Sequence, residues 1–362
     1  MWYRTKYIFI LTHWQYRRMK IFYAVQATGN GHISRAIQLL PYLRKYGQVD
    51  VFLSGANSQL KADMPVRYRS NGVSFFYSRG GGLDYRKTIQ ALNPVRVWDE
   101  VKELPVENYD VVVNDFECIT SLACSYKKIP SVNFGHQASF QSLLTPRPQK
   151  REWMGEFILK HFAKATRYMG LHFKKYDDFI FTPVIKQEVL RAHPLIKNHI
   201  TVYLSAYSDE TVAQYLKQIR GFNFHVFSRQ ADRCSTDDNI QFIPVNNRLF
   251  TESMINSAAV ITGAGFETPA EALHLQKKLM VIPIRGQYEQ LCNAAALEQM
   301  GVNVLNKIDE TFVTAFDKWM QTNTQDQIEY SNNIPELVNH LMENYPYKRK
   351  SMDFLYPNLV FN

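Results

Sequence analysis

A histidine lies in a short glycine-containing segment after the first apolar run of the chain. The run at 21–25 is followed, after one Gln, by Ala-Thr-Gly-Asn-Gly-His, which ends at His32. Gly29 and Gly31 permit a tight turn and close approach of the backbone to a ligand. A neutral imidazole at such a turn can accept a proton from a hydroxyl group, which is general base chemistry. Alternatively, His32 caps the following helix or packs beneath it.

Two carboxylates follow another apolar run, residues 111–113. The segment reads Asn-Asp-Phe-Glu, with Asp115 in second place and Glu117 at its end. A carboxylate at the end of a strand can orient a histidine on a neighbouring loop and stabilise its imidazolium form. Asp is also a favourable N-cap, so capping of the helix expected through Ile119 is the alternative. Taken together with His32, Asp115 favours a catalytic pair.

A glycine-containing segment of the second half is the strongest sign of a ligand site. It runs from Thr262 to Glu271 and reads Thr-Gly-Ala-Gly-Phe-Glu-Thr-Pro-Ala-Glu. Backbone N–H groups at the start of the expected helix suit an anion such as a diphosphate. Glu271 could hold the two hydroxyls of a ribose. It also completes a capping box with Thr268, with Pro269 at the first helical position, and this alone explains both residues structurally.

Two further segments place polar side chains after expected strands. Glu289 and Gln290 begin a helix after the run at 279–282, and adjacent carboxylate and amide groups suit vicinal sugar hydroxyls. The alternative is a solvated first turn favoured by the helix dipole. His136 follows another apolar run and lines an acceptor pocket or belongs to an ordinary loop. The glycines of 79–82 are typical of a loop over a cleft.

All these segments follow short apolar runs that alternate with stretches of helical periodicity. The runs lie at 21–25, 49–53, 111–113, 131–134, 179–181, 200–204, 222–227, 240–243, 259–262 and 279–282. Strands that alternate with helices indicate βαβ units and parallel sheets. Ligands of such sheets bind beyond the carboxyl ends of the strands, where the candidate residues lie. The sequence therefore predicts an α/β protein with two Rossmann-like, doubly wound domains that face a cleft.

The same alternation sets the expected domain limits. We expect one domain at 19–175, a second at 176–345 and a tail at 346–362. An apolar strand opens at Met19. We therefore expect residues 1–18 to be a non-native or disordered extension, with a basic, aromatic membrane anchor as the alternative.

Composition narrows the class of protein. Apolar residues make up 46% of the 362, which is typical of a globular protein. No apolar run approaches the roughly 20 residues that cross a bilayer. The net charge of +9 favours anionic partners, although no RNP-like, helix-turn-helix or zinc-finger pattern supports nucleic acid. Four cysteines without a CxxC pair argue against a zinc site and favour a cytoplasmic protein.

Read together, these motifs resemble those of the GT-B nucleotide-sugar glycosyltransferases. The similarity is greatest to glycosyltransferase family 28, which includes the peptidoglycan N-acetylglucosaminyltransferase. Within that family the chain is similar to largely uncharacterised bacterial and archaeal proteins with GxGHxxRA and DFE motifs. The donor segment is similar to the signature of plant-type glucosyltransferases. The matching segments are 29–36, 115–117, 263–271 and 283–294.

The resemblance implies an inverting transfer of a sugar from a UDP-sugar to a hydroxyl of a lipid, glycan or small molecule. His32 would activate the acceptor hydroxyl and Asp115 would orient His32. The UDP-sugar would be a co-substrate, with no metal and no tightly bound cofactor. Donor contacts would come from Gly263, Gly265, Phe266, Thr268, Glu271, Glu289 and Gln290. The acceptor side would include Gly29, Gly31, Arg35, Glu117 and His136.

Three positions depart from the family pattern. Gly263 stands where relatives carry a phosphate-binding histidine, and Glu267 stands where the plant-type pattern has asparagine. The charge of Glu267 would repel a diphosphate if it pointed inward. The loop at 205–208 lacks the glycine-rich phosphate turn of many relatives.

Two other functions and one location are also compatible with the sequence. A UDP-sugar 2-epimerase shares the fold, and the acidic residues Glu117, Glu267 and Glu289 are compatible with its elimination chemistry. A non-catalytic nucleotide or nucleic-acid binder would suit the net charge. Residues 157–176 look like a basic amphipathic helix, which could rest on the inner face of an anionic membrane and suit a lipid-linked acceptor. An interdomain helix with a solvated basic face is the more common alternative.

Overall fold

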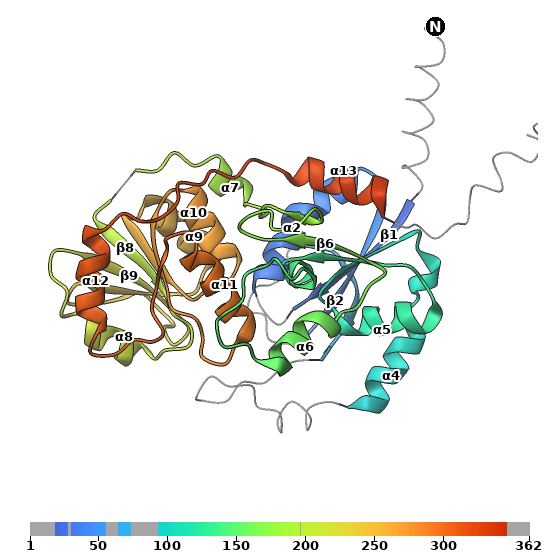
Figure 1. The fold of residues 1–362 in the computed structure, drawn as a ribbon, viewed down its shortest axis with the longest axis horizontal. Coiled ribbons are helices and arrows are strands. Elements are labelled where there is room, and N and C mark those ends of the chain that lie inside the picture. Colours follow the sequence, from blue (N-terminus) through green and yellow to red (C-terminus); the bar gives the residue numbers. More distant parts are fainter. Residues whose placement is uncertain (1–18, 28–29, 56–63, 74–92, 196, 346–362) are drawn as a thin grey trace, which may run out of the picture.

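The computed structural model describes residues 19–27, 30–55, 64–73, 93–195 and 197–345. It contains two seven-stranded sheets that lie next to each other along the long axis of the molecule (Figure 1). The predicted extension at 1–18, the tail at 346–362, Gly29 and the glycines of 79–82 lie outside the described residues. The fold prediction is confirmed, because both halves are α/β units built on parallel sheets.

The first sheet has the strand order β3-β2-β1-β4-β5-β6-β7, and its strands pair in parallel. The chain moves outward from β1 to β3 and then returns to β4 on the other side of β1. The strands are β1 (Met19–Gln26), β2 (Gly47–Ser54), β3 (Val66–Ser70), β4 (Val111–Asp115), β5 (Val132–Gly135), β6 (Arg167–Leu171) and β7 (Ile180–Phe181). The helices are α2 (Asn30–Leu43), α4 (Pro94–Glu103), α5 (Cys118–Lys127) and α6 (Trp153–His161), with short 3-10 turns η1 (Val106–Asn108) and η2 (Gln137–Gln141).

The second sheet has the order β10-β11-β9-β8-β12-β13-β14, in which only the edge strand β10 runs antiparallel among the described strands. Its strands are β8 (His199–Tyr203), β9 (Asn223–Ser228), β10 (Ser235–Asp237), β11 (Ile240–Pro244), β12 (Ala259–Thr262), β13 (Lys278–Val281) and β14 (Asn303–Val304). The helices are α7 (Gln187–Leu190), α8 (Asp209–Leu216), α9 (Asn247–Asn256), α10 (Glu267–His274), α11 (Tyr288–Glu298), α12 (Phe312–Gln321) and α13 (Ile334–Asn344).

Alternate side chains of the buried strands pack into the hydrophobic core on opposite faces of each sheet. Along β12, Ile261 packs in a cluster with Phe312 of α12, whereas Val260 packs in a cluster with Leu273 of α10. Helices on both faces therefore explain why these strands read as continuous apolar runs. The last helix, α13, returns to the first half of the chain and packs against α2 (Figure 1).

Two local predictions are wrong. The strand at 179–181 was expected in the second half, but β7 pairs with β6 and completes the first sheet. Residues 157–176 are not one helix, because α6 ends at His161 and Arg167–Leu171 forms β6 beside β5. Within the described ranges, no helix has both the length and the apolar character needed to cross a bilayer.

Candidate active site

Both sheets reverse their strand order at one point, and parallel sheets bind ligands beyond the strand ends at such points. In the first sheet this point lies between β1 and β4, where Val25 is opposite Asp115. In the second sheet it lies between β8 and β12, where Tyr203 is opposite Thr262. The fold therefore brings the predicted motifs to two strand ends, one in each domain.

His32 and Asp115 meet at the first of these points. His32 lies in the first turn of α2, and Asp115 is the last residue of β4. The imidazole Nδ1 is 2.8 Å from Asp115 Oδ1, and the side chains are 12% and 0% exposed respectively. The contact holds Nδ1 against the carboxylate, so the other ring nitrogen, Nε2, faces away from Asp115.

A third side chain, Arg35, completes this cluster one turn along α2. Its Nε donates to Asp115 Oδ2 at 3.1 Å, and its Nη2 donates to Asp115 Oδ1 at 2.8 Å. The same Nη2 lies 3.0 Å from His32 Nδ1. Gly135 makes room for the cluster, since a Cβ there would lie 2.6 Å from Asp115 Oδ1.

Burial and charge act in opposite directions on this cluster. Burial lowers the pKa of His32, but the charge and hydrogen bond of Asp115 outweigh it, so the pKa is raised from 6.5. Burial raises the pKa of Asp115, but the positive charge of Arg35 and the contact with His32 outweigh it, so this pKa is lowered. Asp115 is therefore held as a carboxylate next to an imidazole that takes up a proton readily.

Glu117 has a different position from the one expected. Its carboxylate accepts from the backbone N–H groups of Ile119 at 2.9 Å and Thr120 at 2.6 Å, which caps α5. Burial raises its pKa despite these bonds. The cap of this helix is thus Glu117 rather than Asp115, and Glu117 is fully buried instead of facing an acceptor.

His136 lies at the contact between the two domains. Its Nδ1 is 2.9 Å from the carbonyl oxygen of Leu171, and its Nε2 is 2.8 Å from Asn293 Oδ1. The ring stacks on Phe266 of the second domain, with centroids 4.0 Å apart and planes 6° apart. Burial lowers the pKa of His136. The structure therefore gives His136 and Phe266 an interdomain packing position, and both are buried.

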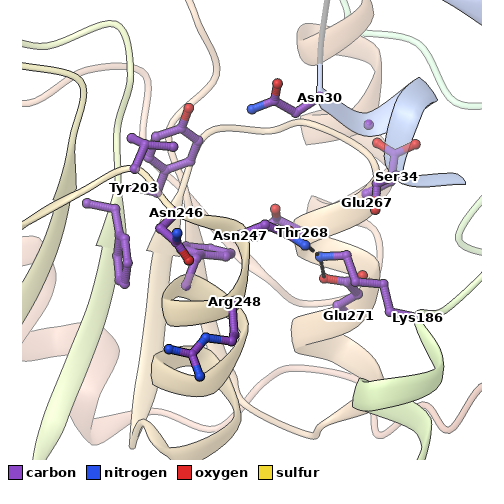
Figure 2. Close-up of a pocket in the computed structure, with 14 residues that line it drawn as sticks. Asn30, Ser34, Lys186, Tyr203, Asn246, Asn247, Arg248, Glu267, Thr268 and Glu271 are labelled. Atoms are coloured by element: carbon purple, nitrogen blue, oxygen red, sulfur yellow. Dashed lines mark hydrogen bonds and ion pairs between the residues drawn. The ribbon is translucent and has the colours of Figure 1, made fainter. Parts of the chain in front are cut away.

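The larger cavity, about 450 Å³, lies mainly in the second domain and is closed on one side by α2 (Figure 2). Glu271 lies in its wall, 2% exposed, with Oε2 3.3 Å from Lys186 Nζ. Lys186 Nζ also donates to Asn247 Oδ1 at 3.2 Å. Figure 2 shows Lys186 extending between these two side chains. Phe227 and Phe250, whose rings are 5.1 Å apart, line another part of the cavity.

The predicted capping box is absent from α10. Phe266 occupies the N-cap position, and no side chain makes a capping hydrogen bond there. Thr268 lines the cavity, and Glu271 turns to Lys186. An ion pair with a distant residue thus replaces the local hydrogen bond. Burial raises the pKa of Glu271, and the charge of Lys186 opposes this only in part.

A smaller cavity of about 110 Å³ lies beside the first and shares Tyr203 and Thr268 with it. Its other walls come from the loops after β8 and β12, including Ser205, Gly263 and Gly265. The loop after β12 leads into α10, and the N–H groups at the start of a helix favour anions. The smaller cavity therefore lies where an anionic group is favoured.

Glu289 and Gln290 point in different directions. Glu289 Oε2 accepts from Gln137 Nε2 of the first domain at 3.0 Å, and this Nε2 is 3.5 Å from His32 Nε2. Gln290 instead lines the smaller cavity and accepts from the backbone N–H of Ile284 at 2.9 Å. Only Glu289 therefore lies close to the histidine side of the cleft.

Glu267, which departs from the family pattern, forms an ion pair with Arg35. Figure 2 shows its carboxylate directed towards α2, away from Glu271 and Lys186. The expected repulsion with a diphosphate is therefore reduced, because a cation neutralises the charge. The sequence motifs did not include Lys186 or Asn247, which lie outside every recognisable spacing. Gln137 belongs to the segment 135–137 that follows β5 together with His136.

Comparison with known proteins identifies the family. Residues 19–320 match the family described as Glycosyl transferase family 1, so the chain belongs to that family. The family match thus indicates that the protein is a glycosyltransferase. No curated protein matches the chain.

Solved structures share the fold over nearly the whole chain. Acinetobacter baumannii MurG has a TM-score of 0.56 at 14% identity, covering 90% of this chain and 99% of its own. Spinosyn forosaminyltransferase SpnP has a TM-score of 0.54 at 13% identity, covering 91% and 96%. Phytolacca americana UGT2, complexed with UDP-2-fluoro-glucose and pterostilbene, has a TM-score of 0.54 at 15% identity, covering 90% of each chain. These similarities show the two-domain GT-B fold.

Proposed function

We propose that this protein is an inverting glycosyltransferase that moves a sugar from a UDP-sugar to an acceptor hydroxyl. The observation that carries the proposal is the His32–Asp115 pair, with an Nδ1 to Oδ1 distance of 2.8 Å, beside a cavity lined by Glu271 and aromatic rings. The GxGHxxRA and DFE motifs support membership of the family 28 subgroup. MurG is among the proteins of similar fold, which agrees with this subgroup.

In the proposed reaction, His32 Nε2 removes the proton of the acceptor hydroxyl. The acceptor oxygen forms a bond to the anomeric carbon while the bond from that carbon to the diphosphate breaks. The electron pair of that bond leaves with UDP. Asp115 stabilises the imidazolium that results, as the carboxylate of a catalytic triad does. Because a single displacement occurs, the anomeric configuration inverts.

The donor nucleotide is proposed to occupy the two cavities. Glu271 would accept hydrogen bonds from the ribose hydroxyls, and the aromatic rings of Phe227 and Phe250 would face the base. The diphosphate would lie at the start of α10, near Gly263, Gly265 and Thr268, where N–H groups stabilise the charge of the leaving group. Glu289 and Gln290 would contact the sugar. Among neighbours of similar fold, UGT2 is complexed with a UDP-sugar, which supports uridine.

Calorimetric titration with UDP, TDP, GDP and ADP tests the donor site. We expect UDP to bind and Glu271→Ala to abolish or strongly weaken this binding. His32→Ala should bind UDP normally but lose about 10²- to 10⁴-fold in transfer rate, the usual contribution of a general base. Glu298→Gln, at the exposed end of α11, is the matched control for a lost carboxylate. If none of the four nucleotides binds to folded protein, the donor site is wrong.

We also propose that the acceptor is lipid-linked and that the first domain contacts an anionic membrane. Four large apolar side chains between η2 and the middle of α6 are exposed, each by more than half: Leu143, Leu144, Trp153 and Phe157. Basic residues Lys150 and Arg151 lie between them and are exposed. Exposed apolar groups flanked by cations are typical of peripheral membrane contacts.

Flotation with vesicles of phosphatidylglycerol and phosphatidylcholine tests this contact. We expect the protein to float with the anionic vesicles and the double variant Trp153→Ser, Phe157→Ser to remain in solution. Leu195→Ser is the matched control, because Leu195 is 72% exposed but lies in the chain before the second sheet. Equal flotation of all three proteins would contradict a contact at this segment, and no flotation of the wild type would contradict membrane contact altogether.

A further inference from the structure

Arg35 connects the candidate base to the opposite domain. Its guanidinium donates through Nε and Nη2 to Asp115 and through Nη1 to Glu267 at the start of α10. The side chain of Arg35 is 2% exposed, while that of Glu267 is 24% exposed. The two residues are 232 positions apart in the chain. One buried cation therefore holds a carboxylate from each domain.

The charges of this cluster respond to the position of Glu267. With His32 neutral, the charges of Arg35, Asp115 and Glu267 give a total of one negative charge. Proton uptake by His32 then brings the cluster to neutrality. If the second domain moved away and took Glu267 with it, proton uptake would instead leave a net positive charge in a buried site. Closure of the domains therefore favours the proton transfer that the base must perform.

The Nδ1 atom of His32 also has two neighbours that compete for it. It lies 2.8 Å from Asp115 Oδ1, which accepts a hydrogen bond, and 3.0 Å from Arg35 Nη2, which donates one. Only the first contact leaves Nε2 unprotonated and able to act as a base. Arg35 also donates to both oxygens of Asp115 and to Glu267, so its orientation determines how the carboxylate meets the imidazole.

The absence of a side chain at residue 31 makes room for Glu267 beside α2. Gly31, one residue before His32, faces the carboxylate of Glu267, and a Cβ built at this glycine would be 2.3 Å from Glu267 Oε2. A side chain at residue 31 would therefore displace Glu267 from its present position. The glycine allows the carboxylate of one domain to approach the helix of the other.

We propose that Arg35 is a positioning residue that ties the His32–Asp115 pair to Glu267, so that the working form of the base exists only when the two domains are closed. The proposal rests on the proposed function, because it assigns a role in the same transfer reaction. The coupling between Glu267 and His32 can nevertheless be measured without a substrate, from the titration of His32.

The test follows the titration of His32 by NMR in the full chain labelled at histidine Cε1, with the His32 signal assigned from His32→Asn. Besides Glu267, four ionisable groups lie around His32, and all stay unchanged in the variants: Asp115 on β4, Arg35 on α2, Tyr23 on β1 and Glu289, reached through Gln137. We expect Glu267→Gln to lower the pKa of His32, because the negative charge of Glu267 contributes to raising it.

Gly31→Ala provides a second route to the same result. It alters no charge but displaces the carboxylate of Glu267, so the pKa of His32 should also fall. Glu298→Gln removes a carboxylate of the same domain outside the cluster and should leave His32 unchanged. An unchanged His32 titration in both Glu267→Gln and Gly31→Ala would overturn the proposal.

Kinetics separate positioning from simple structural support. Arg35→Lys keeps the charge but loses the planar fork, so kcat should fall roughly 10- to 100-fold while KM for the donor changes little. A rise in KM with unchanged kcat would contradict a positioning role.

If UDP does not bind but Glu267→Gln still shifts the His32 titration, the proposed function fails and the interdomain coupling stands. If UDP binds and transfer occurs but His32 does not respond, only the coupling fails.

Discussion

Two buried carboxylates, one on each side of the cleft, differ in how completely they are paired. Asp115 is 0% exposed and accepts hydrogen bonds from His32 and Arg35 at 2.8 to 3.1 Å. Glu271 is 2% exposed, and its polar partner in the described part of the chain is Lys186 Nζ, at 3.3 Å. The pKa of Asp115 is lowered by Arg35 and His32 against the effect of burial, whereas burial raises the pKa of Glu271.

The two carboxylates therefore differ in how much of their hydrogen-bonding capacity the protein itself uses. The histidine side of the cleft is assembled in the free protein, because its carboxylate has all the donors that it needs. The nucleotide side keeps hydrogen-bonding capacity in reserve, because one distant lysine does not satisfy both oxygens of a buried carboxylate. A ligand with adjacent hydroxyls would supply the missing donors. The contrast therefore supports the proposed roles, in which Asp115 serves the transfer step and Glu271 serves binding of the donor.

The largest effect that we expect comes from Asp115→Asn. The amide has nearly the same shape but no charge, so it neither fixes the reactive tautomer of His32 nor stabilises the imidazolium. We expect kcat to fall by about 10³- to 10⁴-fold, by analogy with loss of the carboxylate in a catalytic triad. UDP affinity, measured by calorimetry, should change less than about threefold, since Asp115 lies outside both cavities. A loss of UDP binding as large as the loss of rate would remove the distinction between the two carboxylates.

Lys186→Met should act on stability rather than on chemistry. It leaves Glu271 as an unpaired buried charge, which typically costs about 3 to 5 kcal/mol. The pKa of Glu271 is already raised, so its contribution to stability is lost as pH rises through the folded-state pKa. Urea unfolding should therefore show a larger loss at pH 8 than at pH 5. The double variant Lys186→Met, Glu271→Gln removes the charge and should recover most of the stability at pH 8.

The outcome of Lys186→Met also tests the reserve of hydrogen-bonding capacity. If the variant is as stable as the wild type at both pH values, Glu271 is satisfied by other means and the comparison with Asp115 fails. If the double variant is no more stable than Lys186→Met, the loss comes from packing of the lysine stem rather than from the charge.

Local patterns in the sequence identified the parts of the molecule that depend on neighbours in the chain. Helices α2 and α10 were predicted because apolar runs end before them and stretches of helical periodicity follow. The pairing of His32 with Asp115 was also expected, because both follow apolar runs and a carboxylate can orient a histidine. The structure supplies the adjacency of β1 and β4, which brings the two residues to one edge of the sheet.

The errors come from contacts between distant residues. The apparent capping box gave way to the ion pair of Glu271 with Lys186, which is 85 positions away. Residues 167–171 carry charges and apolar groups that fit a helix, yet they pair with β5, where Gly170 allows close contact with Ser139. Lys186 follows an irregular segment with no motif, so no local signal marks it. The domain limits, the UDP-sugar donor and the class of acceptor stay predictions.

The pH dependence of the transfer reaction should depend on Asp115 but not on Glu271, because only Asp115 contacts His32. A base must be neutral to accept a proton, so kcat/KM should fall as pH drops through the pKa of His32, which lies above 6.5. The Asp115→Asn variant should shift this acid limb to lower pH, because Asp115 is what raises the pKa against burial. Stability runs the other way, since the part that His32 contributes is present below its unfolded pKa and lost as pH rises through the folded value. Variants at Glu271 should leave the position of the acid limb unchanged.

The smallest effect should come from Glu117, a third buried carboxylate two residues from Asp115. Its oxygens are fully used by the backbone N–H groups at the start of α5, so it neither touches the histidine nor has capacity for a ligand. Glu117→Gln keeps one acceptor oxygen and should cost roughly 1 kcal/mol of unfolding free energy, the usual value of a helix cap. Transfer rate and UDP affinity should stay within about twofold of the wild type. A large loss of rate at normal stability would mean that a place in the DFE motif matters more than contact with His32. The distinction among the three carboxylates would then rest on sequence position rather than on their partners.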